Sequence, residues 1–302
     1  MEQAGKREPL LILANRNAGA VARAGGPVPF VRYAHDAGFE PEVLLTHSSD
    51  DLRRRLHQRV LGKLRRVVVA GGDGTIHHAV QVLARSGVAL GILPQGTANN
   101  FANALRLPLD LPSAFKVLAE GEEREVDLGE CDGEYFTEAA GVGLLADALH
   151  LGKRTGSTKR LFRSALHLMR LLLKNRTRRL TLVIDGEPFV EEVLNASIAN
   201  SFMLSLNVPI APEARLDDRR LDVVLLGALT RREMLTYYRA IRAQVHLEMP
   251  KVYSTTGKVI EIRASHRVPV HVDDSTRFRD HVTCRTANGA LKVIVDRGCG
   301  PG

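Results

Sequence analysis

The 302-residue sequence contains no tryptophan, and its only cysteines are Cys131, Cys284 and Cys299. These cysteines are odd in number, far apart and without metal-ligand spacing, so we expect reduced thiols in a cytoplasmic protein. A long hydrophobic run is also missing, because the apolar stretch at residues 10–14 is too short for a signal peptide or a membrane span. We therefore expect neither a disulfide-rich secreted fold nor a membrane-spanning protein.

Acidic residues are absent from one long stretch of a chain with a net charge of +8. None lies between Asp147 and Asp185, whereas lysines and arginines crowd the basic segment at residues 153–179. Within it, residues 161–174 have the spacing of an amphipathic helix with a basic face. Such a helix either packs on the domain with its charges in solvent or makes peripheral contact with an anionic membrane surface. No zinc-finger, helix-turn-helix or RNA-recognition pattern accompanies it, so we expect no nucleic acid partner.

A glycine-rich turn at residues 71–74 joins a predicted strand to a predicted helix. Residues 66–70 are mostly β-branched, as in a buried strand, and residues 76–84 have helical apolar spacing. The glycines leave the main chain open to a ligand, and the start of a helix favours phosphate. Asp73 would repel a bare phosphate, so we expect it beside a magnesium ion or a substrate hydroxyl. A tight turn that only starts a helix is the alternative.

Strands and helices alternate over the first 120 or so residues. This alternation predicts a mostly parallel α/β sheet with right-handed crossovers, whose ligands lie beyond the carboxyl ends of the strands. The polar turns that would meet at that edge are residues 15–19, 46, 71–75 and 96–97. From residue 122 onward, short alternating runs, among them residues 258–264, 268–272 and 291–295, predict the strands of a β-sandwich. We therefore place an α/β domain at residues 1–121 and a β-sandwich domain at residues 122–302.

Residues 90–102 read Leu-Gly-Ile-Leu-Pro-Gln-Gly-Thr-Ala-Asn-Asn-Phe-Ala. This segment resembles the lipid-kinase pattern G-I-(I/L)-P-x-G-T-x-N-(D/N)-(F/L)-A. With the glycine-rich turn and the small residues at 138–147, it makes the chain similar to the diacylglycerol kinase catalytic family, which includes sphingosine kinases and bacterial soluble lipid kinases. The turn alone is also similar to NAD kinases and phosphofructokinase relatives. The resemblance implies a phosphofructokinase/NAD kinase-like parallel sheet, a C-terminal β-sandwich, and transfer of a phosphoryl group from ATP to a lipid hydroxyl such as that of diacylglycerol.

The resemblance also implies an ATP site in the first domain. Its expected residues are Asn15, Gly19, Thr46, Gly71, Gly72, Asp73, Gly74, Thr75, Ile76, His77 and Thr97. A structural magnesium ion is expected at Asp218, with the carbonyls of Arg215 and Arg220 as further ligands. Asp73 is expected to position the catalytic magnesium or the substrate.

The proton-accepting motif of the family, D-G-E, corresponds here to Asp273-Asp274-Ser275. We therefore expect Asp273 to be the base, with Asp274 as the second candidate. Three other departures are Arg219 in place of a glycine in the magnesium segment, and Arg16 and Ala18 in place of a proline and a serine in the first turn. These changes leave open a catalytically impaired nucleotide-binding relative with a regulatory role. An NAD kinase is a third alternative, which residues 95–100 disfavour.

The expected partner is a lipid substrate that reaches the cleft between the domains from a membrane surface. Peripheral contact through the basic segment at residues 153–179 would make the protein cytoplasmic and transiently membrane-associated. Diacylglycerol, monoacylglycerol, phosphatidylglycerol, a sphingoid base and a polyprenol all present a hydroxyl beside a long tail, so the sequence does not name the lipid. It also leaves the oligomeric state open, with a homodimer among the alternatives.

Overall fold

The computed structural model describes residues 7–16, 26–62, 64–153, 177–204 and 208–298. The chain forms two compact units: unit 1 is Met1–Val126 with Gly289–Gly302, and unit 2 is Asp127–Asn288. The end of the chain thus returns to unit 1, whereas the sequence-based division placed it in the second domain. Gly19 and residues 154–176 of the basic segment lie outside the described residues.

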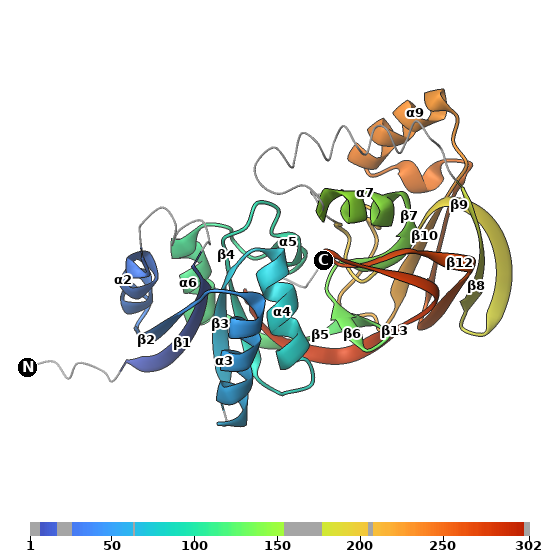
Figure 1. Cartoon of the computed structure of the whole chain (residues 1–302). Helices are drawn as coiled ribbons and strands as arrows, with labels where there is room; N and C mark the ends of the chain where they lie inside the picture. Colours follow the sequence, from blue (N-terminus) through green and yellow to red (C-terminus); the bar gives the residue numbers. More distant parts are fainter. Residues whose placement is uncertain (1–6, 17–25, 63, 154–176, 205–207, 299–302) are drawn as a thin grey trace, which may run out of the picture. The chain divides into compact units, whose positions relative to one another are not determined.

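Unit 1 alternates strands and helices (Figure 1). Its elements are β1 (Glu8–Asn15), α2 (Val28–Asp36), β2 (Phe39–Thr46), α3 (Ser49–Leu61), β3 (Arg66–Gly71), α4 (Asp73–Leu83), β4 (Ala89–Pro94), α5 (Asn100–Ala104), α6 (Leu111–Glu120) and the end of β13 (Ser275–Val295). The strands pair in parallel in the order β2-β1-β3-β4-β13. The predicted parallel α/β sheet is confirmed.

Helices cover both faces of this sheet, with α2 and α6 on one side and α3 and α4 on the other (Figure 1). On the α2 and α6 side, Phe30 and Phe115 pack with Ile12 and Val68 in one buried cluster. A strand that is covered on both faces needs continuous apolar residues. This requirement explains why every residue of β4 is buried.

Unit 2 is built mostly from antiparallel strands. Its elements are β5 (Glu122–Cys131), which starts in unit 1, β6 (Glu134–Phe136), β7 (Ala139–Gly143), α7 (Leu144–Lys153), β8 (Arg178–Ile184), β9 (Glu187–Ala199), β10 (Leu221–Gly227), α9 (Arg231–Arg242), η1 (His246–Glu248), β11 (Val252–Gly257), β12 (Val259–Val272) and most of β13. The strand order is β11-β10-β9-β7-β12-β13, with β8 bridging β9 and β12. The predicted β-sandwich is confirmed.

Several elements of unit 2 differ from the sequence-based expectation. The strands expected at residues 258–264 and 268–272 are one strand, β12, in which an irregularity between Arg263 and Val268 preserves pairing with β13. The strand expected at residues 291–295 is the end of a 21-residue strand. The first part of β13 is largely exposed and polar, so it carries little of the apolar alternation that signals a strand.

No helix in the described part of the chain is long and apolar enough to cross a membrane.

Candidate functional site

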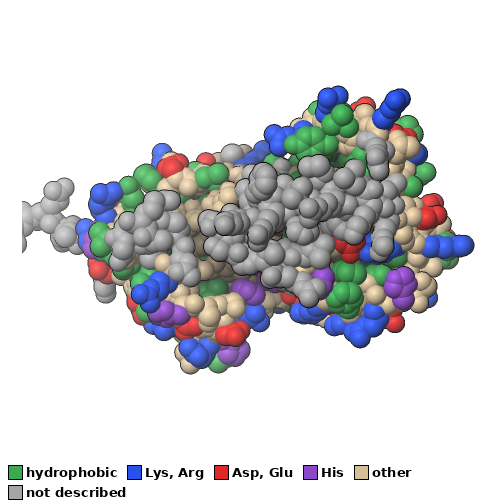
Figure 2. Space-filling view, turned by 45° about the horizontal axis from the view of Figure 1, so that its top comes forward, with side chains coloured by type: hydrophobic (Ala, Val, Ile, Leu, Met, Phe, Trp, Pro, Cys, Tyr) green, Lys and Arg blue, Asp and Glu red, His purple; other side chains and the backbone are tan. Residues whose placement is uncertain are grey.

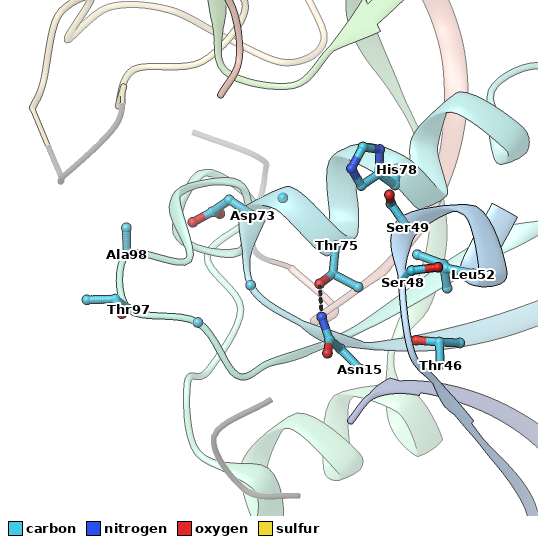
Figure 3. Close-up of a pocket in the computed structure, with 13 residues that line it drawn as sticks. Asn15, Thr46, Ser48, Ser49, Leu52, Asp73, Thr75, His78, Thr97 and Ala98 are labelled. Atoms are coloured by element: carbon cyan, nitrogen blue, oxygen red, sulfur yellow. Dashed lines mark hydrogen bonds between the residues drawn. The ribbon is translucent and has the colours of Figure 1, made fainter. Parts of the chain in front are cut away.

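A cavity of about 480 Å³ lies at the carboxyl ends of the parallel strands of unit 1. Seven residues expected in an ATP site line it: Asn15, Thr46, Gly72, Asp73, Gly74, Thr75 and Thr97. Asn15 and Thr46 end β1 and β2, and the other five follow β3 or β4, so the parallel strands bring these polar residues together at one edge, as predicted. Figure 3 shows the residues that line this pocket.

Two glycines let the loops of the pocket approach each other closely. A Cβ atom on Gly96 would lie 2.5 Å from the Cα of Gly72, and one on Gly72 would lie 2.9 Å from the Cα of Gly96. Both distances are shorter than a real Cβ contact, so neither loop has room for a side chain there. The loop after β3 and the loop after β4 thus touch through bare backbone.

Two helices begin at the pocket, and both present N-terminal N–H groups there. Helix α4 starts at Asp73, directly after Gly72, and no side chain caps its first turn. Helix α3 starts at Ser49, and the Ser48 hydroxyl accepts a hydrogen bond from the backbone N–H of Asp51. The positive ends of two helix dipoles favour an anion such as a phosphate chain.

Side-chain hydrogen bonds hold the polar lining in place. The Asn15 amide donates to the Thr75 hydroxyl at 3.2 Å, which ties the end of β1 to the first turn of α4 (Figure 3). The Thr46 hydroxyl donates to the carbonyl of Ala14 at 3.3 Å, which ties β2 to β1. These bonds fix the oxygen atoms that a bound ligand would meet.

Asp73 is the acidic side chain among the described residues that line the pocket. Its Oδ1 accepts a hydrogen bond from the backbone N–H of Phe101 at 3.3 Å. Burial raises the pKa of Asp73, and hydrogen bonds from the backbone of Phe101 and Asn99 partly offset the rise. A carboxylate with a raised pKa accepts a proton more readily than one with the usual pKa. A nearby cation would stabilise its charged form.

Three expected residues do not line the pocket. Gly71 ends β3, where its carbonyl accepts a hydrogen bond from the backbone N–H of Gln95 at 2.9 Å. Ile76 and His77 are buried on the core side of α4. In a helix, residues three apart share a face, so Thr75 and His78 point to the pocket while the two residues between them turn away.

The sequence-based expectation missed five lining residues, which are Ser48, Ser49, Leu52, His78 and Ala98. In Figure 3, Ser48, Ser49 and Leu52 lie on the side opposite Thr97 and Ala98. The first three come from the start of α3, which follows β2 at the same edge of the sheet. Thr46 was expected here because ligands bind beyond the carboxyl ends of parallel strands. The same reasoning, extended to the first turn of the helix that follows β2, would have included these three residues.

Asp273 of unit 2 is buried, and both oxygens of its carboxylate accept hydrogen bonds. Its carboxylate accepts hydrogen bonds from the backbone N–H and hydroxyl of Thr137 at 3.0 and 3.2 Å, and from the backbone N–H groups of Glu138 and Ala139 at 2.9 and 3.3 Å. Its φ of 47° is left-handed, which Asp tolerates in a tight turn. Asp274, the next residue, is exposed.

A second carboxylate lies beside the serine that replaces the glutamate of the D-G-E motif. The Ser275 hydroxyl donates to Oε1 of Glu134 at 3.4 Å, and Arg277 pairs with Oε2 of the same carboxylate at 2.5 Å. Glu134 belongs to β6, far from residue 275 in the sequence. Pattern matching along one segment does not reveal such a neighbour.

The segment expected to bind structural magnesium contains a tight turn. Arg219 has a φ of 63° and donates its backbone N–H to the Asp127 carboxylate at 2.7 Å. Oδ1 of Asp218 accepts from the backbone N–H of Arg220 at 3.0 Å, and Arg215 pairs with Asp217 at 3.1 Å. Residue 219 has a left-handed backbone conformation, which glycine adopts without steric strain, so a glycine would suit this position.

Acidic side chains gather next to this turn. Burial, the charge of Asp218 and the charge of Glu213 raise the pKa of Asp222 to about 7. Among the described residues, no three His, Cys, Asp or Glu side chains are arranged to hold a metal ion. A cation at Asp218 would therefore need backbone carbonyls as well, and those of Arg215 and Arg220 stay a prediction.

Two domain families match the chain. Residues 9–131 match the family described as the diacylglycerol kinase catalytic domain, and residues 139–295 match the YegS C-terminal NAD kinase beta sandwich-like domain. The first match contains the pocket of unit 1. The second contains the strands of unit 2 from β7 to β13 and the turn at residues 273–275.

Individual relatives agree with these matches. The diacylglycerol kinase of Staphylococcus carnosus is 26% identical over 243 residues, which cover 78% of each chain. That of Bacillus subtilis is 26% identical over 242 residues, covering 78% of this chain and 80% of the relative. The crystal structure of a diacylglycerol kinase from Bacillus anthracis shares the fold with a TM-score of 0.73 at 19% identity, covering 97% and 98% of the two chains. The chain therefore belongs to the family of proteins that combine a diacylglycerol kinase catalytic domain with a YegS C-terminal domain.

Proposed function

We propose that this protein transfers the γ-phosphoryl group of ATP to the hydroxyl group of a lipid, with diacylglycerol as the first acceptor to test. The observation that carries the proposal is the pocket of unit 1, where two helix N-termini and two bare glycines meet in the segment that matches a diacylglycerol kinase catalytic domain. The relatives named as diacylglycerol kinases support the choice of acceptor. Cytoplasmic localisation belongs to the same proposal, and the free thiols of Cys131 and Cys284 support it.

In the proposed reaction, the lipid hydroxyl attacks the γ-phosphorus in line with the leaving oxygen of ADP. The bond from this phosphorus to the bridging oxygen breaks, and the hydroxyl proton passes to a base. The first turn of α4 and the start of α3 would hold the phosphates through N–H groups. Accurate placement of the two reactants is the larger contribution to the rate, because effective molarities of aligned groups are very high.

We infer that Asp73 is the proton acceptor. It lies in the pocket, and burial raises its pKa, which suits a carboxylate base. The sequence assigned this role to Asp273, whose carboxylate oxygens instead accept four hydrogen bonds from residues 137–139. Asp274 is exposed and stays the second candidate.

Magnesium fits the oxygen-rich lining of the pocket. The side-chain oxygens of Asn15 and Thr75 lie within one cavity, and hard divalent cations prefer oxygen ligands. Asp73, as the proposed base, would remain free to accept the proton and would not bind the ion directly. A bound magnesium ion would neutralise charge on the phosphates as they react. The amide of Asn15 and the hydroxyl of Thr75 would orient the ligands through the bond between them.

The test is a phosphorylation assay with the purified chain, labelled ATP, magnesium and a panel of lipids. The panel contains diacylglycerol, monoacylglycerol, phosphatidylglycerol, a sphingoid base and a polyprenol. The expected product is heavier than one of these lipids by one phosphoryl group. ATP binding without any phosphorylated lipid would favour the catalytically impaired relative, and formation of NADP from NAD would favour an NAD kinase.

A pair of variants identifies the site responsible for the activity. Asp73→Asn should lower kcat by about 10²- to 10⁴-fold, because it removes the proposed base. Asp36→Asn is the matched control, since this exposed carboxylate lies at the end of α2 and outside the pocket. Equal activity of the two variants would refute the assignment of Asp73.

A further inference from the structure

Helix α9 is held firmly on unit 2 by one of its faces. Met234 and Ile241 are buried in a cluster with strand residues of β10 and β11. The ring of Tyr237 packs edge-on against His246, with centroids 5.8 Å apart. The helix begins with a capping box, in which Thr230 and Glu233 bond each other's backbone N–H groups. These contacts fix α9 on unit 2, and none of them involves the opposite face of the helix.

The opposite face of α9 carries hydrophobic and basic side chains in solvent. Leu235 is 54% exposed and Tyr238 is 60% exposed. Arg232, Arg239 and Arg242 are also exposed. Positions 232, 235, 238, 239 and 242 are spaced by three or four residues, so they share one side of the helix. Figure 2 shows hydrophobic side chains between Lys and Arg side chains where α9 lies, at the upper right.

Positive charge dominates this face because Lys251 neutralises the nearby carboxylate of Glu233. Glu233, the acidic residue of α9, pairs with Lys251 at 2.9 Å and caps the start of the helix. No acidic side chain in the described ranges forms an ion pair with Arg232, Arg239 or Arg242. Two exposed apolar groups flanked by three unpaired arginines differ from an ordinary solvated helix face, which carries charges of both signs.

We propose that α9 docks unit 2 on the surface of an anionic phospholipid bilayer. Arginines attract anionic head groups, while a leucine and a tyrosine on the same face enter the region between head groups and acyl chains. The pattern fits a bilayer better than an acidic protein, because an amphipathic Tyr side chain and flexible Arg side chains suit an interface that is apolar on one side and wet on the other. The docking face of α9 is defined as Arg232, Leu235, Tyr238, Arg239 and Arg242.

This inference extends the proposed function, since an enzyme that phosphorylates a membrane lipid must meet the bilayer. The two can fail separately. Vesicle binding is measured without ATP, whereas phosphorylation of a water-soluble, short-chain diacylglycerol needs no bilayer. If the protein phosphorylated the short-chain lipid but did not bind vesicles, the membrane-docking proposal would be refuted and the proposed function would stand.

The first experiment is co-sedimentation of the full chain with phosphatidylcholine vesicles that contain either no phosphatidylserine or about 30% of it. Wild type is expected to bind only the anionic vesicles, and added salt should weaken binding. Arg232→Gln, Arg239→Gln and Arg242→Gln combined should weaken binding about 100-fold, since each surface arginine contributes about fivefold. Thermal unfolding should not change, because these side chains are exposed.

The matched control changes the net charge by the same amount elsewhere on unit 2. It combines Arg263→Gln, Arg267→Gln and Arg285→Gln, which alter three exposed arginines of β12 and β13. The control is expected to bind anionic vesicles like wild type. Equal loss in both triple variants would show a general charge effect and would overturn the assignment to α9.

The second experiment uses the absence of tryptophan from the chain. Leu235→Trp places a single tryptophan on the docking face, and its emission should shift to shorter wavelength when anionic vesicles are added. Val190→Trp, at an exposed position of β9, is the control and should not shift. An unshifted Leu235→Trp, or wild-type binding by the triple variant of α9, would overturn the proposal.

Discussion

Two buried titratable groups of unit 2 should change the stability of the protein in opposite directions over the same pH range. His271 is fully buried, and burial lowers its pKa to about 4 from a usual 6.5. The charge of Asp273 and a hydrogen bond with its backbone offset part of the effect of burial on this pKa. Burial and nearby acidic charge raise the pKa of Asp222 to about 7 from a usual 3.8. Proton linkage turns each shift into a pH dependence of the free energy of unfolding.

The signs follow from which state binds more protons. Between about pH 4 and pH 6.5 the unfolded chain protonates His271 and the folded chain does not, so stability rises with pH. Between about pH 4 and pH 7 the folded chain protonates Asp222 and the unfolded chain does not, so stability falls with pH. From about pH 5 to pH 7 the histidine adds about 2 kcal/mol, and the aspartate, screened by solvent at its partly exposed carboxyl, removes about 1 kcal/mol.

The assay is urea unfolding followed by circular dichroism at about pH 5 and about pH 7. For wild type, these two groups together should add about 1 kcal/mol to the free energy of unfolding over this interval. Asp222→Asn should increase that gain to about 2 kcal/mol, because only the histidine contribution remains. His271→Leu should reverse it to a loss of about 1 kcal/mol.

The control is Asp280→Asn, which changes an exposed carboxylate of β13 and should leave the pH dependence as in wild type. If Asp222→Asn also matched wild type, the burial argument for Asp222 would be wrong. If His271→Leu still gained stability as the pH rose, the histidine would not be the group responsible.

Three further substitutions test local features of the structure. Asp273→Ala should lower the free energy of unfolding by about 3 kcal/mol, because four donors lose a charged acceptor, while Asp274→Ala should change it by less than about 0.5 kcal/mol in the same urea titration. Gly96→Ala should weaken ATP binding at least about tenfold in calorimetry, since its methyl group would overlap Gly72, and unchanged affinity would contradict the pocket. Arg219→Gly should raise the free energy of unfolding by about 0.5 kcal/mol because glycine adopts a left-handed turn without strain; a lower melting temperature would refute this.

The pocket of unit 1 could be predicted because its determinants are local. Alternating strands and helices imply a parallel sheet, and a parallel sheet gathers its turns at one edge. Asn15, Thr46 and Thr97 therefore came from the position of each turn along the chain. The family resemblance included His77, which is buried on the core side of α4, whereas His78 lines the pocket because it lies three residues after Thr75 on the same face of the helix.

The sequence by itself determined the alternation of elements, the glycine-rich turns and the family resemblance, all of which depend on neighbours a few residues apart. Only the tertiary structure decided that Asp273 binds the backbone of residues 137–139, that Glu134 lies beside Ser275, and that one side of α9 is left in solvent. Contacts between residues more than 100 positions apart depend on how the whole chain packs, and burial, which sets the pKa values of His271 and Asp222, is a property of that packing.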